Sequence, residues 1–174
     1  MKVVFDASLL LPLLEPGVPV PAPPAGISAA SAVPRIEHLI DTLDGEGAVA
    51  LVPTPALSEV LTRAGAATAT MLHRLKTIRF FEIVSFDELA AIECAAMLSE
   101  TRRGGRKAPA ATWAKAKFDH QIAAVAKVYG AARIYSDDGD LKKLGPRLGM
   151  AVIGLWDLPA PPEDAEPSLP FGDR

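Results

Sequence analysis

The sequence predicts an α/β protein, a three-layer α/β/α sandwich with a mainly parallel central sheet. Short apolar runs of β type alternate along the chain with segments whose apolar residues recur at helical spacing. This alternation is typical of parallel strands that are joined by crossover helices. Of the 174 residues, 49% are hydrophobic and 22% are charged, which is enough apolar material for one domain with a substantial core.

The N-terminal part of the chain predicts one strand, one short helix and one loop. Residues 3–5 form an apolar run that predicts a buried strand ending at Asp6. The first turns of a helix are expected over residues 9–14, cut off by Pro12 and Pro16. Residues 16–34 are rich in Pro, Ala and Gly, so we interpret them as an inserted loop.

The next segment predicts a helix, a strand and a second helix. Residues 36–43 place their apolar side chains on one face of a helix, and residues 48–52 predict the second strand. Thr54 is expected to cap the following helix, Pro55 suits its first turn, and Gly65 is expected to end it.

A third strand is expected at residues 80–84, after a helix over 67–77. The helix over residues 86–101 follows, with Ser85 or Asp87 as its N-cap. We expect this helix to bury Leu89, Ile92 and Leu98.

The C-terminal part predicts the longest helix and the last two strands. The helix covers residues 112–129, and helical spacing predicts that it buries Phe118, Ile122, Val125 and Tyr129. Strands are expected at 132–135 and 151–155, with a short helix at 140–144 between them. We expect a domain over residues 1–158 and a flexible, acidic, Pro-rich tail over 159–174.

Charge and composition narrow the function. The net charge is −3 and the pI is about 5.6, so a nucleic-acid role requires a local basic patch or a metal that neutralises acids. One cysteine and three histidines argue against an internal disulfide and a structural zinc site. There is no signal peptide and no apolar run near the roughly 20 residues of a membrane span, which predicts a cytoplasmic protein that does not bind membranes.

Acidic residues lie at the predicted strand ends. The carboxyl ends of parallel strands meet at one edge of a sheet, where sites of α/β proteins form. Residues from two strand ends and two helices are expected to converge there: Asp6, Glu59, Asp119, Asp137, Asp138 and Asp140. Oxygen ligands without His or Cys suit Mg²⁺ or Mn²⁺.

Each acid also has a purely structural interpretation. Asp6 can cap the helix that follows it. The negative charge of Glu59 can interact favourably with the dipole at the start of its helix. Asp119 can be an ordinary acid on a helix surface. Residues 137–140 can be a turn with an N-cap.

Four segments, taken in order, resemble the motifs of PIN-domain proteins, and in particular of small VapC-type toxin ribonucleases. They are VVFDAS at 3–8, PALSEV at 55–60, FDHQIAAVA at 118–126 and IYSDDGDL at 134–141. The resemblance spans about residues 1–158. It departs from the family pattern in the long segment 16–34 and in Leu141, where a Phe is more usual.

The resemblance implies a metal-dependent endoribonuclease that hydrolyses RNA phosphodiester bonds with Mg²⁺ or Mn²⁺. It also implies the toxin role in a toxin–antitoxin pair, with an antitoxin protein as partner and a homodimeric assembly. Carried over by position, the catalytic and metal-binding acids are Asp6, Glu59, Asp119 and Asp138. The supporting residues are Ser8, Ser136, Asp137 and Asp140. Spacing from Ser136 favours Asp138 over Asp137 as the ligand.

One concentrated basic stretch precedes Asp119. Its residues are expected to hold RNA phosphates, with a solvated loop as the alternative: Arg102, Arg103, Arg106, Lys107 and Lys115. Trp113 is expected either to stack on a base or to be buried.

Two other classes of α/β protein are excluded by the sequence. A haloacid-dehalogenase-type phosphatase needs a second Asp two residues after the first, where this chain has Ser8. A receiver domain needs an Asp after the third strand, where this chain has Ser85. A PIN-like module that binds RNA or protein without turnover stays open.

Overall fold

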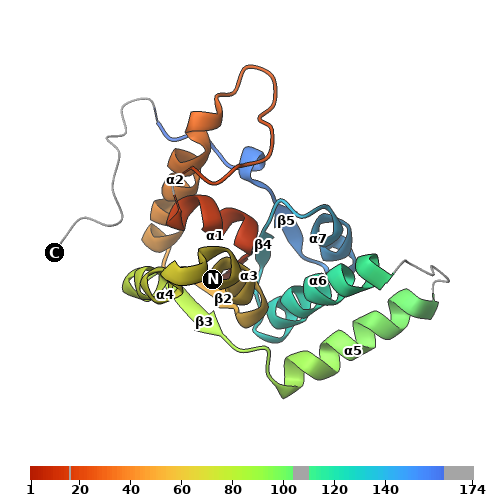
Figure 1. Cartoon of the computed structure of the whole chain (residues 1–174). Helices are drawn as coiled ribbons and strands as arrows, with labels where there is room; N and C mark the ends of the chain where they lie inside the picture. Colours follow the sequence, from red (N-terminus) through yellow and green to blue (C-terminus); the bar gives the residue numbers. More distant parts are fainter. Residues whose placement is uncertain (16, 104–109, 163–174) are drawn as a thin grey trace.

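The strands of the protein form one sheet in which every neighbouring pair is parallel. The computed structural model describes residues 1–15, 17–103 and 110–162 (Figure 1). The five strands are ordered β3-β2-β1-β4-β5, and helices flank the sheet, so the predicted fold class is confirmed.

The elements follow the predicted order. The strands are β1 (Lys2–Phe5), β2 (Val49–Pro53), β3 (Phe81–Val84), β4 (Arg133–Tyr135) and β5 (Ala151–Ile153). The helices are α1 (Ala7–Leu14), α2 (Ala32–Gly45), α3 (Thr54–Ala64), α4 (Thr68–Thr77), α5 (Glu88–Arg103), α6 (Ala110–Val128) and α7 (Gly139–Leu144). Short 3₁₀ turns lie at Ala29–Ser31, Gly65–Ala67, Gly145–Leu148 and Leu155–Asp157.

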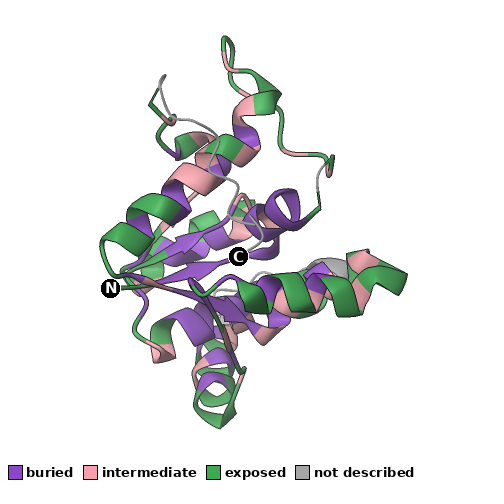
Figure 2. Cartoon of the chain, turned by 90° about the vertical axis from the view of Figure 1, so that its left-hand side faces the viewer, coloured by how far each residue is buried: buried purple, intermediate pink, exposed green. Residues whose placement is uncertain are grey.

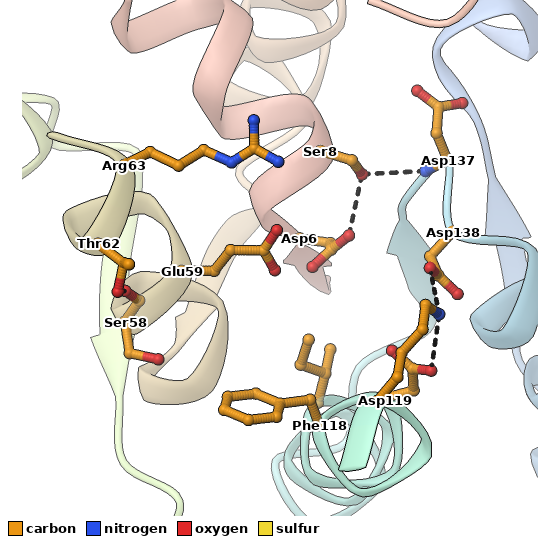
Figure 3. A pocket seen from close by; sticks show the side chains of 12 residues that line it. Asp6, Ser8, Ser58, Glu59, Thr62, Arg63, Phe118, Asp119, Asp137 and Asp138 are labelled. Atoms are coloured by element: carbon orange, nitrogen blue, oxygen red, sulfur yellow. Dashed lines mark hydrogen bonds and ion pairs between the residues drawn. The ribbon is translucent and has the colours of Figure 1, made fainter. Parts of the chain in front are cut away.

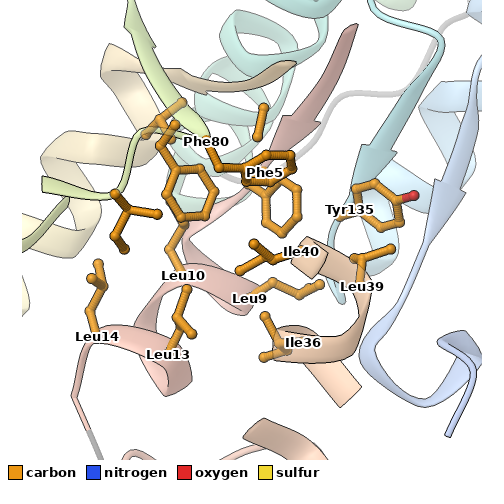
Figure 4. Close-up of a cluster of buried hydrophobic side chains, with 14 of the residues drawn as sticks. Phe5, Leu9, Leu10, Leu13, Leu14, Ile36, Leu39, Ile40, Phe80 and Tyr135 are labelled. Carbon is orange, nitrogen blue, oxygen red and sulfur yellow. The ribbon is translucent and has the colours of Figure 1, made fainter. Parts of the chain in front are cut away.

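The two faces of the sheet are covered by different helices. Because successive side chains of a strand point to opposite faces, Val3 and Phe5 pack against α1, α2 and α4, whereas Val4 packs against α5, α6 and α7. Figure 2 shows the buried sheet between these helical layers, and Figure 4 shows the side chains packed around Phe5. Burial on both faces explains why the strands read as continuous apolar runs.

The sheet contains one point where its strand order reverses. The chain places β2 and β3 on one side of β1, and then crosses to place β4 and β5 on the other side. β1 and β4 are neighbours, with Phe5 opposite Tyr135, and their ring centroids are 5.1 Å apart. The next residues, Asp6 and Ser136, therefore leave the sheet side by side. In open α/β sheets such a reversal is the usual place for a binding site.

Two predictions about the N-terminal part were wrong. α1 continues through Pro12 to Leu14, because its leucines are buried and each contributes about 1.5–3 kcal/mol, which offsets the loss of one helical hydrogen bond. The loop predicted at 16–34 is shorter, because the turn at Ala29–Ser31 and the start of α2 lie within it. The Ala32 side chain is buried there and helps to anchor α2.

Predictions of helix faces and caps were wrong at four residues. Leu89 and Ile92 of α5 are 64% and 61% exposed, and Phe118 of α6 is 48% exposed. α5 instead buries a narrower stripe, formed by Ala90, Cys94 and Met97, against the core on the side of the sheet that α6 and α7 cover. The Thr54 hydroxyl does not cap α3, because it accepts a hydrogen bond from the Phe86 N–H at 2.9 Å.

The alternative caps of α5 are resolved in favour of Asp87, whose carboxylate accepts a hydrogen bond from the Ala90 N–H at 2.9 Å. Residues 163–174 of the predicted tail lie outside the described part of the chain. None of the helices within the described ranges is long and apolar enough to cross a membrane.

The close approach between Gly145 and β5 gives a test of the fold. A Cβ at Gly145 would collide with the Val152 side chain and lie 2.8 Å from the Met150 carbonyl oxygen. We expect Gly145→Ala to lower the free energy of unfolding by about 1–3 kcal/mol, measured by urea denaturation. The control is Gly45→Ala, since nothing lies within 4 Å of that Cβ. Equal stability of the two variants would contradict the close packing of β5.

Candidate active site

A pocket of about 630 Å³ opens beyond the carboxyl ends of β1 and β4, at the reversal of strand order (Figure 3). α3 and α6 form its other walls. It is lined by Asp6, Ser8, Ser58, Glu59, Thr62, Arg63, Lys115, Phe118, Asp119, Ile122, Asp137 and Asp138. The pocket thus brings together five of the six predicted acids, and Asp140 follows directly in α7.

Asp6 is held in place by two serine hydroxyls. Ser8 and Ser136 donate hydrogen bonds to Asp6 Oδ2 at 2.9 and 2.7 Å. Each hydroxyl also accepts a backbone N–H at 3.0 Å, Ser8 from Asp137 and Ser136 from Asp138. A hydroxyl carries one hydrogen, so the backbone donors orient both hydrogens towards Asp6. The Asp6 side chain makes no capping bond to α1, so the alternative interpretation of Asp6 as a simple helix cap is wrong.

The two oxygens of Asp138 have different partners. Oδ1 accepts the N–H groups of Asp140 and Leu141 at 2.7 and 3.1 Å and so caps α7. Oδ2 accepts a hydrogen bond from Lys115 Nζ at 2.7 Å. Burial opposes ionisation, but the hydrogen bonds from Lys115 and the backbone outweigh burial and lower the pKa of Asp138. The capping role predicted for residues 137–140 is therefore combined with a carboxylate oxygen that faces the pocket.

Asp137 points away from this cluster. Its Oδ1 accepts the Leu155 N–H at 2.9 Å and lies 3.9 Å from Lys142 Nζ. Its other carboxylate oxygen is buried without a hydrogen-bond partner, and burial raises the pKa of Asp137. Asp137 therefore ties the loop after β4 to the turn after β5, and Asp138 presents its carboxylate to the pocket (Figure 3).

The Lys115 ammonium lies among three carboxylates. Its Nζ is 3.1 Å from Asp119, 2.7 Å from Asp138 and 3.2 Å from Asp140. Lys115 was predicted to contact RNA phosphates, and the structure pairs it with the acids. Burial disfavours the charged ammonium, but the hydrogen bonds to the three acids outweigh burial and raise the pKa of Lys115.

Burial and neighbouring carboxylates raise the pKa of two other acids. Burial, followed by the charge of Asp138, raises the pKa of Asp119 to about 6, although Lys115 opposes the shift. Burial, followed by the charge of Asp6, raises the pKa of Glu59. Figure 3 shows the Glu59 carboxylate directed from α3 towards Asp6. The pocket therefore holds more negative charge than its own cations balance, which raises the cost of ionising its acids.

The acids fit a divalent cation. Asp119, Asp138 and Asp140 each offer one oxygen, and these three oxygens lie within 4.8 Å of one another. In this structure a lysine ammonium already occupies the space between them. An all-oxygen set that stabilises a cation is chemically suited to Mg²⁺ or Mn²⁺.

Sequence reasoning missed several residues that line the pocket. Ser58, Thr62 and Arg63 come from α3, and Arg63 follows Glu59 by four residues, a spacing that places both on one side of a helix. Phe118 was predicted to be in the core and instead lines the pocket. Trp113 is partly exposed and is not among the lining residues.

Most side chains of the predicted basic stretch lie outside the described part of the chain. Arg106 and Lys107 lie outside the described residues, and so do the side chains of Arg102 and Arg103 at the end of α5. Their expected role with RNA phosphates stays a prediction.

Solved structures with the same fold are toxin complexes and toxins. A chain of VapBC2 from Rickettsia felis, solved with a promoter DNA fragment, matches with a TM-score of 0.60 at 11% identity, over 88% of this chain and 98% of that chain. FitAcB from Neisseria gonorrhoeae matches with 0.57 at 20% identity, over 90% and 99%. VapC20 from Mycobacterium tuberculosis, a sarcin-ricin loop cleaving toxin, matches with 0.53 at 16% identity, over 82% and 95%.

No protein-family model matches the sequence, and no curated protein matches it. At these identities the structural matches establish the fold alone, and they confirm the PIN-like α/β fold that the sequence predicted.

The raised pKa of Asp119 predicts a pH-dependent stability. The fold favours protonated Asp119, so its contribution is fully present below the unfolded value near 4 and is lost as the pH rises through about 6. We expect Asp119→Asn to gain about 1–2 kcal/mol relative to wild type between pH 4 and pH 7.5, after allowance for partial solvent screening. Urea unfolding at several pH values measures this difference.

The matched control for this measurement is Asp44→Asn, since Asp44 is an exposed acid of α2. A constant difference between Asp119→Asn and wild type across this pH range would contradict the burial and crowding of Asp119.

Proposed function

We propose that the protein is a metal-dependent endoribonuclease that hydrolyses RNA phosphodiester bonds with Mg²⁺ or Mn²⁺. The observation that carries the proposal is a set of three carboxylates, from α6, α7 and the loop before α7, that surround the Lys115 ammonium. Asp6, which a serine hydroxyl holds in place, lies beside them. RNA phosphates and carboxylates attract the same cations, so a site of this kind suits a phosphodiester.

The chain's own residues have distinct roles in this proposal. Asp119, Asp138 and Asp140 would hold the ion, with Asp6 and Glu59 completing the negative wall of the pocket. When bound, a divalent ion supplies positive charge to the phosphate and makes a water more acidic.

Ser8 and Ser136 are positioning residues in this proposal, because they fix the direction of the Asp6 carboxylate. Glu59 has a raised pKa and points into the pocket, so its carboxylate is suited to take a proton from an attacking water.

The structural matches support the choice of substrate and partner. One of them, VapC20, is described as a toxin that cleaves the sarcin-ricin loop, and others are VapBC and FitAB complexes. We therefore extend the proposal to the toxin role in a toxin–antitoxin pair, with an antitoxin protein as partner and a homodimeric assembly. The alternative is a binding module of the same fold without turnover.

Loss of two acids tests the nuclease proposal. We expect the wild type to cleave members of a pool of labelled RNAs with Mg²⁺ or Mn²⁺, and EDTA to stop the reaction. Asp6→Asn and Asp119→Asn should each lower the rate by at least about 10²-fold, because each removes a charge that positions or holds the ion. Gel electrophoresis of the products measures the rate, and Asp44→Asn is the control.

Cleavage that persists in EDTA, or in both acid variants, would place the activity elsewhere. The absence of cleavage together with no Mn²⁺ binding by calorimetry would favour the binding module without turnover.

Lys115 provides an independent test of the ion site. A divalent ion between Asp119, Asp138 and Asp140 must displace the Lys115 ammonium, so Lys115→Met should bind Mn²⁺ more tightly. A partly exposed ion pair contributes roughly 1 kcal/mol, which corresponds to about fivefold in the dissociation constant. Isothermal calorimetry with Mn²⁺ measures the change.

The matched control is Lys143→Met, because within the described residues Lys143 pairs with one acid, Asp140, at 2.8 Å and its side chain is 77% exposed. Weaker Mn²⁺ binding by Lys115→Met would mean that Lys115 holds the acids in position and does not compete with the ion.

A further inference from the structure

Phe118 is an exposed aromatic residue in the wall of the acidic pocket. Four large apolar side chains are exposed within the described residues, namely Met1, Leu89, Ile92 and Phe118. Among these four, Phe118 is the aromatic one, and it lines the pocket. A Phe side chain that stays nearly half exposed gives up part of the roughly 1.5–3 kcal/mol that burial would contribute. The exposed ring therefore leaves an aromatic face available to a ligand in the pocket.

The ring is held beside the acids and does not point at them. Phe118 directly precedes Asp119 in α6, so the two side chains leave the helix in different directions. Figure 3 shows the ring reaching from α6 across the pocket towards Ser58 and Glu59 of α3. Ile122, one turn further along α6, lines the same wall and is buried. The ring thus lies on a rigid helix, with apolar support next to it.

The pocket has two chemically different parts. One part carries the carboxylates of Asp6, Asp119 and Asp138, which would hold an ion and, through it, a phosphate. The other part, between α3 and the Phe118 side of α6, is lined by Ser58, Thr62, Arg63, Phe118 and Ile122, and Glu59 is the one carboxylate on its α3 wall. The acids repel an anionic ligand from the ring unless a cation intervenes, whereas a neutral flat ring system meets no such repulsion.

We propose that this second part of the pocket is a nucleobase subsite, in which an unpaired base stacks on Phe118 next to the phosphate at the acids. A base in a duplex has both faces covered by its neighbours, so the subsite selects single-stranded or looped RNA. Arg63, on the opposite wall, offers N–H donors to the edge of the base or to the next phosphate. The proposal rests on the nuclease function above, because that function places the phosphate at the acids.

Binding of defined oligonucleotides tests the subsite without turnover. The probes are fluorescein-labelled 12-mers of adenylate and of uridylate, their duplex, and a 12-mer of abasic ribose units with the same phosphates. Binding is measured by fluorescence anisotropy in the Asp6→Asn background, in which cleavage is not expected. We expect the single strands with bases to bind more tightly than both the abasic strand and the duplex.

Phe118 variants separate stacking from charge. Phe118→Ala should weaken binding of the adenylate 12-mer by about 5- to 100-fold and leave the abasic strand unchanged, as for the loss of one stacked base. Phe118→Trp should retain the affinity for adenylate, because it keeps an aromatic face. Leu89→Ala is the matched control, since it removes an exposed apolar side chain of α5 that does not line the pocket.

Two results would overturn the subsite: equal affinity of Phe118→Ala and the Asp6→Asn parent for adenylate, or an equal loss for adenylate and the abasic strand. The outcome is separate from that of the nuclease proposal. Base-dependent loss in Phe118→Ala without any metal-dependent cleavage by the wild type would support the subsite and reject the nuclease. Metal-dependent cleavage by the wild type that Phe118→Ala leaves unaffected, together with unchanged binding of adenylate, would support the nuclease and reject the subsite.

Discussion

The hydrogen bonds that Ser8 and Ser136 donate to Asp6 are the constraint on which the rest of the site depends. Asp6 is 5% exposed, and a buried carboxylate is costly unless it is hydrogen-bonded. The two hydroxyls meet this need, and they accept the N–H groups of the loop after β4. The position of Asp138 then follows from the position of Asp6, although the two residues lie more than a hundred positions apart in the chain.

From Asp138 the network continues into two helices. One carboxylate oxygen caps α7 and the other accepts a hydrogen bond from Lys115, which also contacts Asp119 within α6. The ends of β1 and β4, the start of α7 and the first half of α6 are thus joined through polar contacts at one edge of the sheet. Burial, followed by the negative charge that this network concentrates, raises the pKa of Asp119, and the same charge makes the site suitable for a divalent cation.

The apolar core is arranged so that this polar edge remains accessible. The strand ends are anchored by buried rings, with Phe5 and Tyr135 directly before Asp6 and Ser136. The helices cover both faces of the sheet but leave its carboxyl edge open as a pocket. A similar frame occurs in toxin structures that share 11–20% of their residues with this chain, which shows that the frame tolerates extensive change in sequence.

The sequence by itself determined the parallel α/β fold and the strand-end positions of Asp6 and Asp138. Both follow from local information, because buried strands need continuous apolar runs and the residue after a strand lies at the sheet edge.

Only the tertiary structure decided that Phe118 faces the pocket, that Leu89 is exposed and that Lys115 lies among acids up to 25 residues away. A helical repeat shows which residues share a face, but what covers that face depends on the packing of distant elements.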